Sequence, residues 1–349
     1  MLTLKSDLTP ESGSRRPARL AFSPDGTALL TSVGDRVQVW PRWLDQPPRP
    51  AVTNEGALER VALNPDGSLV YLYRSGNSFT DVLTVATGTT KGAGLPKDAP
   101  SWAHFDATGG FFLVSHGQGW LTRYDYAPEL KNKVRKAWAL ARYSEGTGRH
   151  RRPLGSHYWF GAICGSGGVF VTLEYKFGRG EPFDGLTVRS VADGSVVFHR
   201  ALKSDEANKL LDKAGLALAV HPTGGYMAYP DGPDVRLRAL AEGVKVRAKV
   251  TVLKKPAAKK VAAKATAKKA RKPKSPPEVT AVTFNPAGTV LAAASESGAV
   301  TLYDTQSWKA VGAFDWKIGP LRAVCFSADG TRAAVISDAG TVMVWDVDV

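Results

Sequence analysis

The sequence predicts an all-β protein, because one strand–turn–strand pattern recurs along almost the whole chain of 349 residues. Two observations carry this prediction. A five-residue motif that ends in glycine appears repeatedly, and short apolar runs of alternating character precede and follow it. A hydrophobic content of 43% is ample for a sizeable core, while the length alone allows either one large domain or two ordinary ones.

The glycine motif marks a tight turn, since its last position suits the positive φ that such turns need. Its six clearest copies are Phe22–Gly26, Leu63–Gly67, Phe105–Gly109, Val220–Gly224, Phe284–Gly288 and Phe326–Gly330. Cys164–Gly168 is a decayed seventh copy. The seven final glycines are spaced by 41, 42, 59, 56, 64 and 42 residues.

Apolar runs surround each copy in the same order. One run leads into the motif, as in Val282–Phe284, and a second follows it, as in Thr27–Leu30. A third run ends in an aromatic residue, as in Val37–Trp40, Val300–Asp304 and Val342–Asp346. Short β-rich runs separated by such turns are typical of strands that meander within antiparallel sheets.

On these residues the chain resembles the WD40 family, and Tyr303-Asp304 and Trp345-Asp346 are the most recognisable fragments. The resemblance covers nearly the whole chain. It implies a seven-bladed β-propeller of four-stranded antiparallel blades, forming a single domain over residues 1–349. Trp316-Lys317 stands where family repeats often have Gly-His, and Ala339, next to Asp338, stands where they have aspartate. We therefore expect the family's buried Asp-His-Ser-Trp network to be missing or rearranged, with blade packing resting on apolar side chains.

The two ends of the chain predict how the ring closes. The last repeat stops at Val349, just after its third strand, and the alternating segment Leu2–Leu8 precedes the first repeat. We expect this N-terminal segment to pair as the outer strand of the last blade, which leaves only short, protected edges.

The residues in excess of a 42-residue repeat fall into three gaps, by 17, 14 and 22 residues. We assign them to Ala141–His157, which follows a predicted outer strand Lys133–Leu140, to Tyr175–Gly185 together with Leu202–Gly215, and to the segment after a predicted strand Val244–Val250. In a four-stranded blade all of these connections lie at one face. Long loops on one side of a rigid scaffold are typical of a binding face, although they also accumulate neutrally.

Arginine and aromatic residues gather where the innermost strands begin at that face. The candidate partner-binding rim consists of Arg19, Arg60, Trp102, Tyr158, Trp159 and Arg322. Arginine and tryptophan are enriched at interface hot spots, so these residues suit an acidic or mixed peptide. In the alternative interpretation the aromatic residues pack between blades and the arginines are merely solvated.

The net charge of +14 is concentrated in the segment 254–277, which holds nine lysines and Arg271 without an acidic residue. Its composition is similar to the Lys/Ala/Pro-rich tails of linker-histone-like proteins, and we expect a disordered insertion between blades 5 and 6. Such a segment suits nucleic acid or another polyanion; an inert linker and a contact with an anionic membrane remain alternatives. The candidate polyanion-binding residues are Arg149, Arg151, Arg152, Lys254, Lys255, Lys259, Lys260, Lys264, Lys268, Lys269, Arg271, Lys272 and Lys274.

Motifs for catalysis and metal binding do not support an enzyme. The six histidines show no metal-ligand spacing, and GxSxG, HExxH and P-loop motifs are missing from the sequence. We expect no cofactor, no metal and no small-molecule substrate, and take Cys164 and Cys325 as small core residues in a reducing, cytoplasmic setting without a signal peptide or membrane span. The first functional hypothesis is therefore a protein-interaction scaffold. A polyanion-binding protein is the alternative, and an enzyme with a site at the channel mouth is less favoured.

Overall fold

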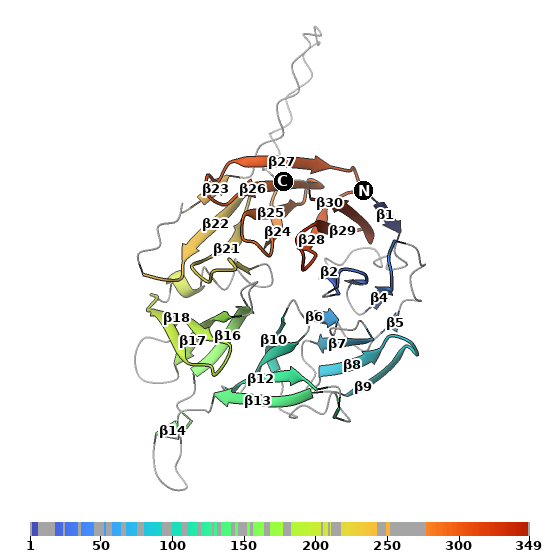
Figure 1. Cartoon of the computed structure of the whole chain (residues 1–349). Coiled ribbons are helices and arrows are strands. Elements are labelled where there is room, and N and C mark those ends of the chain that lie inside the picture. Colours follow the sequence, from blue (N-terminus) through green and yellow to red (C-terminus); the bar gives the residue numbers. More distant parts are fainter. Residues whose placement is uncertain are drawn as a thin grey trace, which may run out of the picture.

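The computed structural model confirms an all-β protein. It describes residues 2–5, 18–23, 25–33, 36–44, 52–53, 58–63, 68–74, 80–92, 100–106, 110–116, 120–127, 129–130, 134–140, 144–145, 152–153, 156–163, 168–176, 183–203, 205–208, 210, 218–242, 249–251 and 277–347. Within this part of the chain, seven antiparallel sheets have four strands each, and one further sheet has two. The seven larger sheets lie around a common centre, as expected for a β-propeller (Figure 1).

We number the seven sheets in chain order. Sheet 1 contains β2 (Ala18–Phe22), β3 (Leu29–Val33), β4 (Arg36–Trp40) and β5 (Val52–Thr53); sheet 2 contains β6 (Leu58–Leu63), β7 (Leu69–Arg74), β8 (Thr80–Thr84) and β9 (Thr89–Gly92). Sheet 3 contains β10 (Pro100–Phe105), β11 (Phe111–His116), β12 (Trp120–Tyr126) and β13 (Val134–Leu140); sheet 4 contains β16 (Ser156–Ile163), β17 (Val169–Lys176), β18 (Phe183–Ser190) and β19 (Val196–Arg200).

Sheet 5 contains β20 (Ala219–Val220), β21 (Tyr226–Asp231), β22 (Asp234–Ala239) and β23 (Lys249–Thr251); sheet 6 contains β24 (Val279–Phe284), β25 (Val290–Ser295), β26 (Ala299–Asp304) and β27 (Ala310–Asp315). Sheet 7 contains β28 (Leu321–Phe326), β29 (Arg332–Ser337), β30 (Thr341–Asp346) and, on its outside, β1 (Leu2–Lys5). β1 pairs antiparallel with β30, with Leu2 opposite Val344 and Lys5 opposite Thr341.

The glycine motif forms the turn between the first and second strands of a sheet. Gly26 has a φ of 71°, and its amide donates to the carbonyl of Ser23 at 2.8 Å. Ser23 Oγ accepts from the amide of Ala28 at 2.8 Å and donates to Asp25 Oδ1 at 2.5 Å. Gly224, Gly288 and Gly330 repeat the positive φ. A residue with a Cβ would be strained at this positive φ, and this explains why the motif ends in glycine.

The hydrophobic core is divided among the seams between neighbouring sheets. Seven clusters of buried side chains occur, and each combines residues from two adjacent sheets. The cluster that joins sheets 7 and 1 includes Leu4 of β1, Val342 of β30 and Trp40 of β4. The first strands also contact one another in the order β2, β6, β10, β16, β20, β24, β28, and β28 contacts β2.

The predicted loop Tyr175–Gly185 was too long, and three other predicted segments lie partly outside the described residues. The N-terminal strand is described for Leu2–Lys5, β13 begins at Val134, and only Lys249–Thr251 forms the described strand before the lysine-rich segment. β17 extends to Lys176 and β18 starts at Phe183, which shortens the expected loop Tyr175–Gly185 between them.

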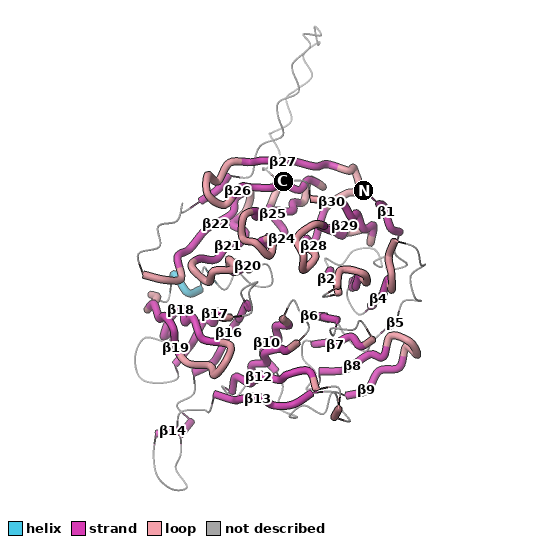
Figure 2. The backbone as a smooth tube through the Cα atoms, in the orientation of Figure 1, coloured by secondary structure: helices cyan, strands magenta, loops and turns pink. Residues whose placement is uncertain are grey.

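Two of the expected loops contain secondary structure. The connection before β16 includes a two-stranded sheet of β14 (Ser144–Glu145) and β15 (Arg152–Pro153). The connection after β19 includes a helical segment at residues 205–208, drawn in cyan beside sheet 5 (Figure 2). Leu202, Ala207 and Leu210 from this connection are buried in the cluster that joins sheets 4 and 5. It is therefore part of the core rather than a simple surface loop.

Candidate partner-binding face

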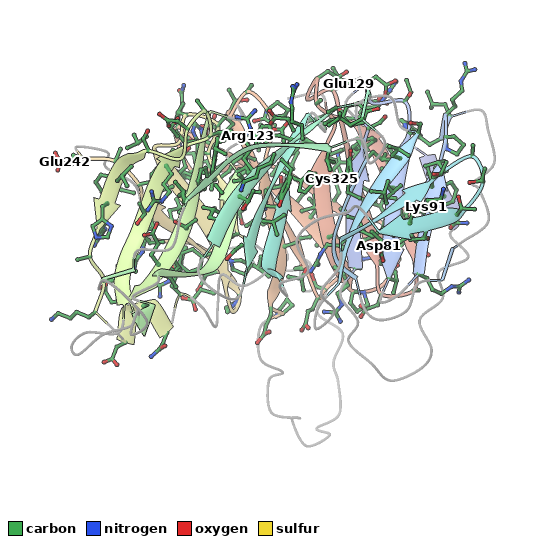
Figure 3. All side chains as sticks on the ribbon, turned by 90° about the horizontal axis from the view of Figure 1, so that it is seen from below. Asp81, Lys91, Arg123, Glu129, Glu242 and Cys325 are labelled. Carbon is green, nitrogen blue, oxygen red and sulfur yellow. The ribbon has the colours of Figure 1, made fainter. Side chains whose placement is uncertain are left out.

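The strand order in the sheets defines two faces of the molecule. The turns between first and second strands and between third and fourth strands lie at one face, which we call the turn face. The turns between second and third strands and the connections from one sheet to the next lie at the opposite face, the insertion face. Glu129 and Glu242, both in turns between third and fourth strands, lie on the upper side in Figure 3, which is the turn face.

All the extra segments begin and end at the insertion face. They connect β13 to β16, β17 to β18, β19 to β20 and β23 to β24. The last of these contains the candidate polyanion-binding residues from Lys254 to Lys274, all of which lie outside the described residues, as do Arg149 and Arg151. Arg152 lies in β15, but its side chain is outside the described set.

A β-bulge recurs at the start of the first strand in five sheets. The register shifts between Leu58 and Arg60, Pro100 and Trp102, Tyr158 and Phe160, Val279 and Ala281, and Leu321 and Ala323. The extra residue at each shift is Glu59, Ser101, Trp159, Thr280 or Arg322. Bulges re-aim side chains and are common beside functional sites. Two of the predicted rim residues, Trp159 and Arg322, are therefore bulge residues at equivalent positions.

Among the predicted rim residues, Arg322 has the most described side-chain contacts. Its guanidinium pairs with both carboxylate oxygens of Asp338, with Nη2 at 2.6 Å from Oδ2, and Nη1 lies 3.5 Å from Glu296 Oε1. The hydrogen bonds that Arg322 donates to Asp338 are the main cause of its raised pKa. Since Glu296 belongs to sheet 6 and Asp338 to sheet 7, Arg322 links the two sheets. Its charge is therefore already paired within the protein.

The other predicted rim residues lie in first strands at the insertion face. Arg19 is partly buried in β2, and its Nη1 donates to the carbonyl of Ala18 at 2.9 Å. Arg60, Trp102, Tyr158 and Trp159 lie in β6, β10 and β16, and their side chains are outside the described set. The backbones of all six predicted rim residues thus lie at the insertion-face end of the first strands. The β-bulges at this rim were not predicted from the sequence.

Further cations at the described part of the insertion face are also paired. Arg236 Nε lies 2.6 Å from Asp231 Oδ2, which is the largest cause of its raised pKa. Lys317 Nζ contacts Asp315 Oδ2. Glu278 and Glu296 add negative charge beside them. The described surface of sheets 5 to 7 is consequently mixed in charge.

A cavity of about 260 Å³ lies between the first strands. Its lining comes from β2, β10, β16, β20, β24 and β28, and most of it is apolar, as with Leu20, Phe284 and Phe326. Cys325 lines this cavity, and burial raises the pKa of its thiol to about 12. Among the described residues, His104 is the titratable side chain that shares the cavity with Cys325. The alternative of a channel-mouth enzyme predicts converging polar groups, and this apolar lining does not favour it.

The rearrangement expected in place of the Asp-His-Ser-Trp network takes a different form in sheets 1, 4 and 7. In sheet 1 Trp40 Nε1 donates to Thr31 Oγ1 at 3.3 Å. In sheet 7 the equivalent Trp345 Nε1 is buried without a hydrogen-bond partner, and the ring packs against Trp316 at 4.8 Å between centroids. In sheet 4 an ion pair of Arg189 and Glu174 occupies this region. The ion pair lies within sheet 4, and apolar side chains pack this sheet against sheet 5, as expected.

Comparison with known proteins gives a family for the last two sheets. The family model described as the WD domain, G-beta repeat, matches residues 271–304 and 313–346. A search of curated proteins found no match. The matched segments end at the close of β26 and β30, the third strands of sheets 6 and 7. Their Tyr303-Asp304 and Trp345-Asp346 endings are those noted in the sequence, and these two segments match WD40 repeats.

Proposed function

We propose that this chain is a seven-bladed, closed β-propeller that acts as a non-enzymatic scaffold and binds a partner protein or peptide at its insertion face. WD40 repeats generally mediate protein–protein interaction. The seven four-stranded sheets serve as blades, and β1 completes the last of them as its outer strand. The extra segments supply variable binding elements on this rigid frame.

The recurrent bulge at the insertion-face rim is the observation that carries the proposal. A bulge costs regular pairing, yet it occurs at the same place in β6, β10, β16, β24 and β28. In each of these five sheets the bulge changes the direction of one side chain near the start of the first strand. Arg19, Arg60, Trp102, Tyr158, Trp159 and Arg322 lie on this rim, with Arg322 holding it in shape through Asp338 and Glu296.

Site-specific crosslinking tests which face binds. A photoreactive amino acid replaces Glu278 at the insertion face or Leu44 at the turn face; both side chains are exposed. We expect crosslinked partner adducts in cell extract from position 278 and none above background from position 44. Adducts from position 44 alone, or equal adducts from both, would contradict the proposal.

The concentration of positive charge favours a second function, in which the lysine-rich segment binds nucleic acid or another polyanion. The segment 254–277 carries ten basic residues and connects β23 to β24 at the insertion face. Counterion release makes such binding fall steeply with salt, by roughly 10³–10⁵ between 50 and 200 mM for six to ten phosphate contacts. Duplex DNA and single-stranded RNA are titrated against the intact chain and a variant without 254–277. Binding that is salt-independent, or that survives the deletion, would rule this function out.

A further inference from the structure

A pocket of about 560 Å³ lies at the circumference between sheets 4 and 5, away from the insertion-face rim. Sheet 4 contributes apolar side chains, among them Val188 and Phe198, and sheet 5 contributes Leu240. Two successive glycines, Gly224 and Gly225, line the sheet 5 side, and Gly224 lies close against the side chain of Val169 from sheet 4. The volume is within the range of ordinary ligand pockets.

The outer strand β19 forms one wall of this pocket and leaves a sheet edge exposed. β19 pairs with β18 and is the last strand in its sheet, at the circumference of the molecule (Figure 2). The register shifts between Phe198 and Val196, which makes Val197 a bulge residue. Val196 is 54% exposed and Val197 61% exposed, so two adjacent apolar side chains face solvent beside the pocket.

Other outer strands show what is unusual here. β27 has the same bulge, at Val311, which is 49% exposed, but the residues on either side of it, Ala310 and Gly312, are only partly exposed. β13 carries Arg135 and Lys136, and charged side chains of this kind normally protect a sheet edge. β19 combines the bulge, a pair of exposed valines, an open edge and an adjacent pocket.

The charge at the pocket rim indicates what the occupant carries. Glu242 lines the pocket from the turn between β22 and β23 and is exposed. On the pocket's other wall, His199 is held by Thr187, whose Oγ1 lies 3.1 Å from Nδ1. An exposed carboxylate beside a pocket that holds both apolar and polar groups favours a ligand in which a basic side chain follows an apolar one.

We propose that this pocket binds a short, extended peptide of a partner protein, with one β-branched or aromatic side chain inside and a lysine or arginine beside Glu242. The exposed valines extend the apolar surface beyond the pocket, which suits a peptide better than a small molecule. The edge of β19 offers backbone hydrogen bonds to an extended chain. This site is separate from the insertion-face rim, so the failure of one proposal leaves the other standing.

Peptide selection on the intact protein tests the site. Random ten-residue peptides are displayed and selected on the chain, and the enriched sequences are synthesised and titrated by fluorescence anisotropy. We expect alternating apolar residues with one basic residue. Val197→Asp weakens their binding roughly tenfold or more, as at the centre of an interface, while Val311→Asp, the matched bulge valine of β27, leaves it unchanged.

A charge exchange completes the test. Glu242→Lys weakens the selected peptides, and replacing their basic residue by glutamate restores binding to that variant. Selected peptides that bind Val197→Asp as well as the unaltered chain would overturn the proposal. So would a concentration-dependent dimer in sedimentation that Val197→Asp abolishes, because a second copy of the chain would then be the occupant.

Discussion

At the scale of single residues, Trp40 and Trp345 show how one side chain changes the packing of a repeat. Trp40 is opposite Leu29, and Thr31, two residues further along β3, accepts its indole hydrogen bond. Trp345 is opposite Ala333, and the position equivalent to Thr31 is Val335, which has no acceptor. The buried indole of Trp345 therefore lacks a partner, and leaving such a donor unsatisfied costs about 1–3 kcal/mol.

Val335→Thr is expected to supply that acceptor. We predict a free energy of unfolding that is unchanged or raised by up to about 1 kcal/mol, since the new hydrogen bond offsets the buried hydroxyl. Val344→Thr, on the opposite side of the same sheet and packed in a different cluster, serves as the control and should destabilise by about 1–3 kcal/mol. Guanidinium unfolding measures both. Equal losses in the two variants would show that Trp345 does not use the added hydroxyl.

His221 makes a second residue-scale contact, between sheets 5 and 6. Its Nε2–H donates to the carbonyl of Gly288 at 2.9 Å, and Nδ1 accepts from the hydroxyl of Thr223 at 2.7 Å. Protonation of His221 would put a hydrogen on Nδ1, which then could no longer accept the hydrogen bond from Thr223. Burial lowers the pKa of His221 below its usual 6.5. A lowered pKa means that this stabilisation is present above about pH 6.5 and is lost as the pH falls through the folded-state value.

The pH dependence of unfolding tests this contact. The intact chain is expected to lose more stability between pH 8 and pH 5 than His221→Gln, whose side-chain amide still donates to Gly288 but does not titrate. Urea unfolding at each pH gives the two differences. Parallel curves for both proteins would exclude His221 as the cause.

At the scale of elements, sheet 4 contains a polar network within its core. Arg189 of β18 donates from Nε to Glu174 Oε1 at 2.9 Å and from Nη2 to Oε2 at 3.2 Å, and Thr172 Oγ1 donates to the same carboxylate at 2.9 Å. Glu174 is 3% exposed. A buried bidentate pair of this kind stabilises only while both partners are present.

Removing one partner of this pair should be far more harmful than removing both. Glu174→Ala is expected to lower the free energy of unfolding by about 3–5 kcal/mol, because Arg189 is left as a buried, uncompensated charge. The double variant Glu174→Met with Arg189→Leu should recover most of that loss. A double-mutant cycle by urea unfolding supplies the numbers, and additive losses would contradict the network.

At the scale of the whole molecule, the N- and C-terminal parts are joined through sheet 7. Leu4 of β1 packs with Val342, Val344 and Trp40, so the first strand contributes to the seam between sheets 7 and 1. Without β1, the outer edge of β30 would be open to pairing with other chains.

Two deletions with opposite expectations test this closure. Removing residues 1–5 is expected to lower the thermal unfolding midpoint and to promote association, because β30 becomes an edge. Removing 254–277 should leave the midpoint unchanged, since β23 and β24 are retained on either side. Scanning calorimetry and sedimentation measure both effects. An N-terminal deletion that remains monomeric with an unchanged midpoint would refute the role of β1.

Much of this architecture could be predicted because it depends on local chemistry. The turn at Gly26 needs a positive φ, and the alternating runs around it put one side of each strand in a seam, so strands and sheets follow from nearby residues. The pairing of β1 with β30 was also accessible, since an alternating segment without a partner remained at the start of the chain. The exact ends of strands could not be predicted, because each end depends on contacts with a neighbouring strand or sheet.

The sequence by itself determined the repeat, the all-β class and the location of the extra segments, since these depend on periodicity and turn residues. Only the tertiary structure decided the rest. It placed Glu296 and Asp338 around Arg322, packed Leu202 and Leu210 into the core, and set Val196 and Val197 beside a pocket. Each of these results from the meeting of residues in different sheets. These contacts depend on how side chains pack between neighbouring sheets, and the sequence pattern of a single strand or turn does not specify that packing.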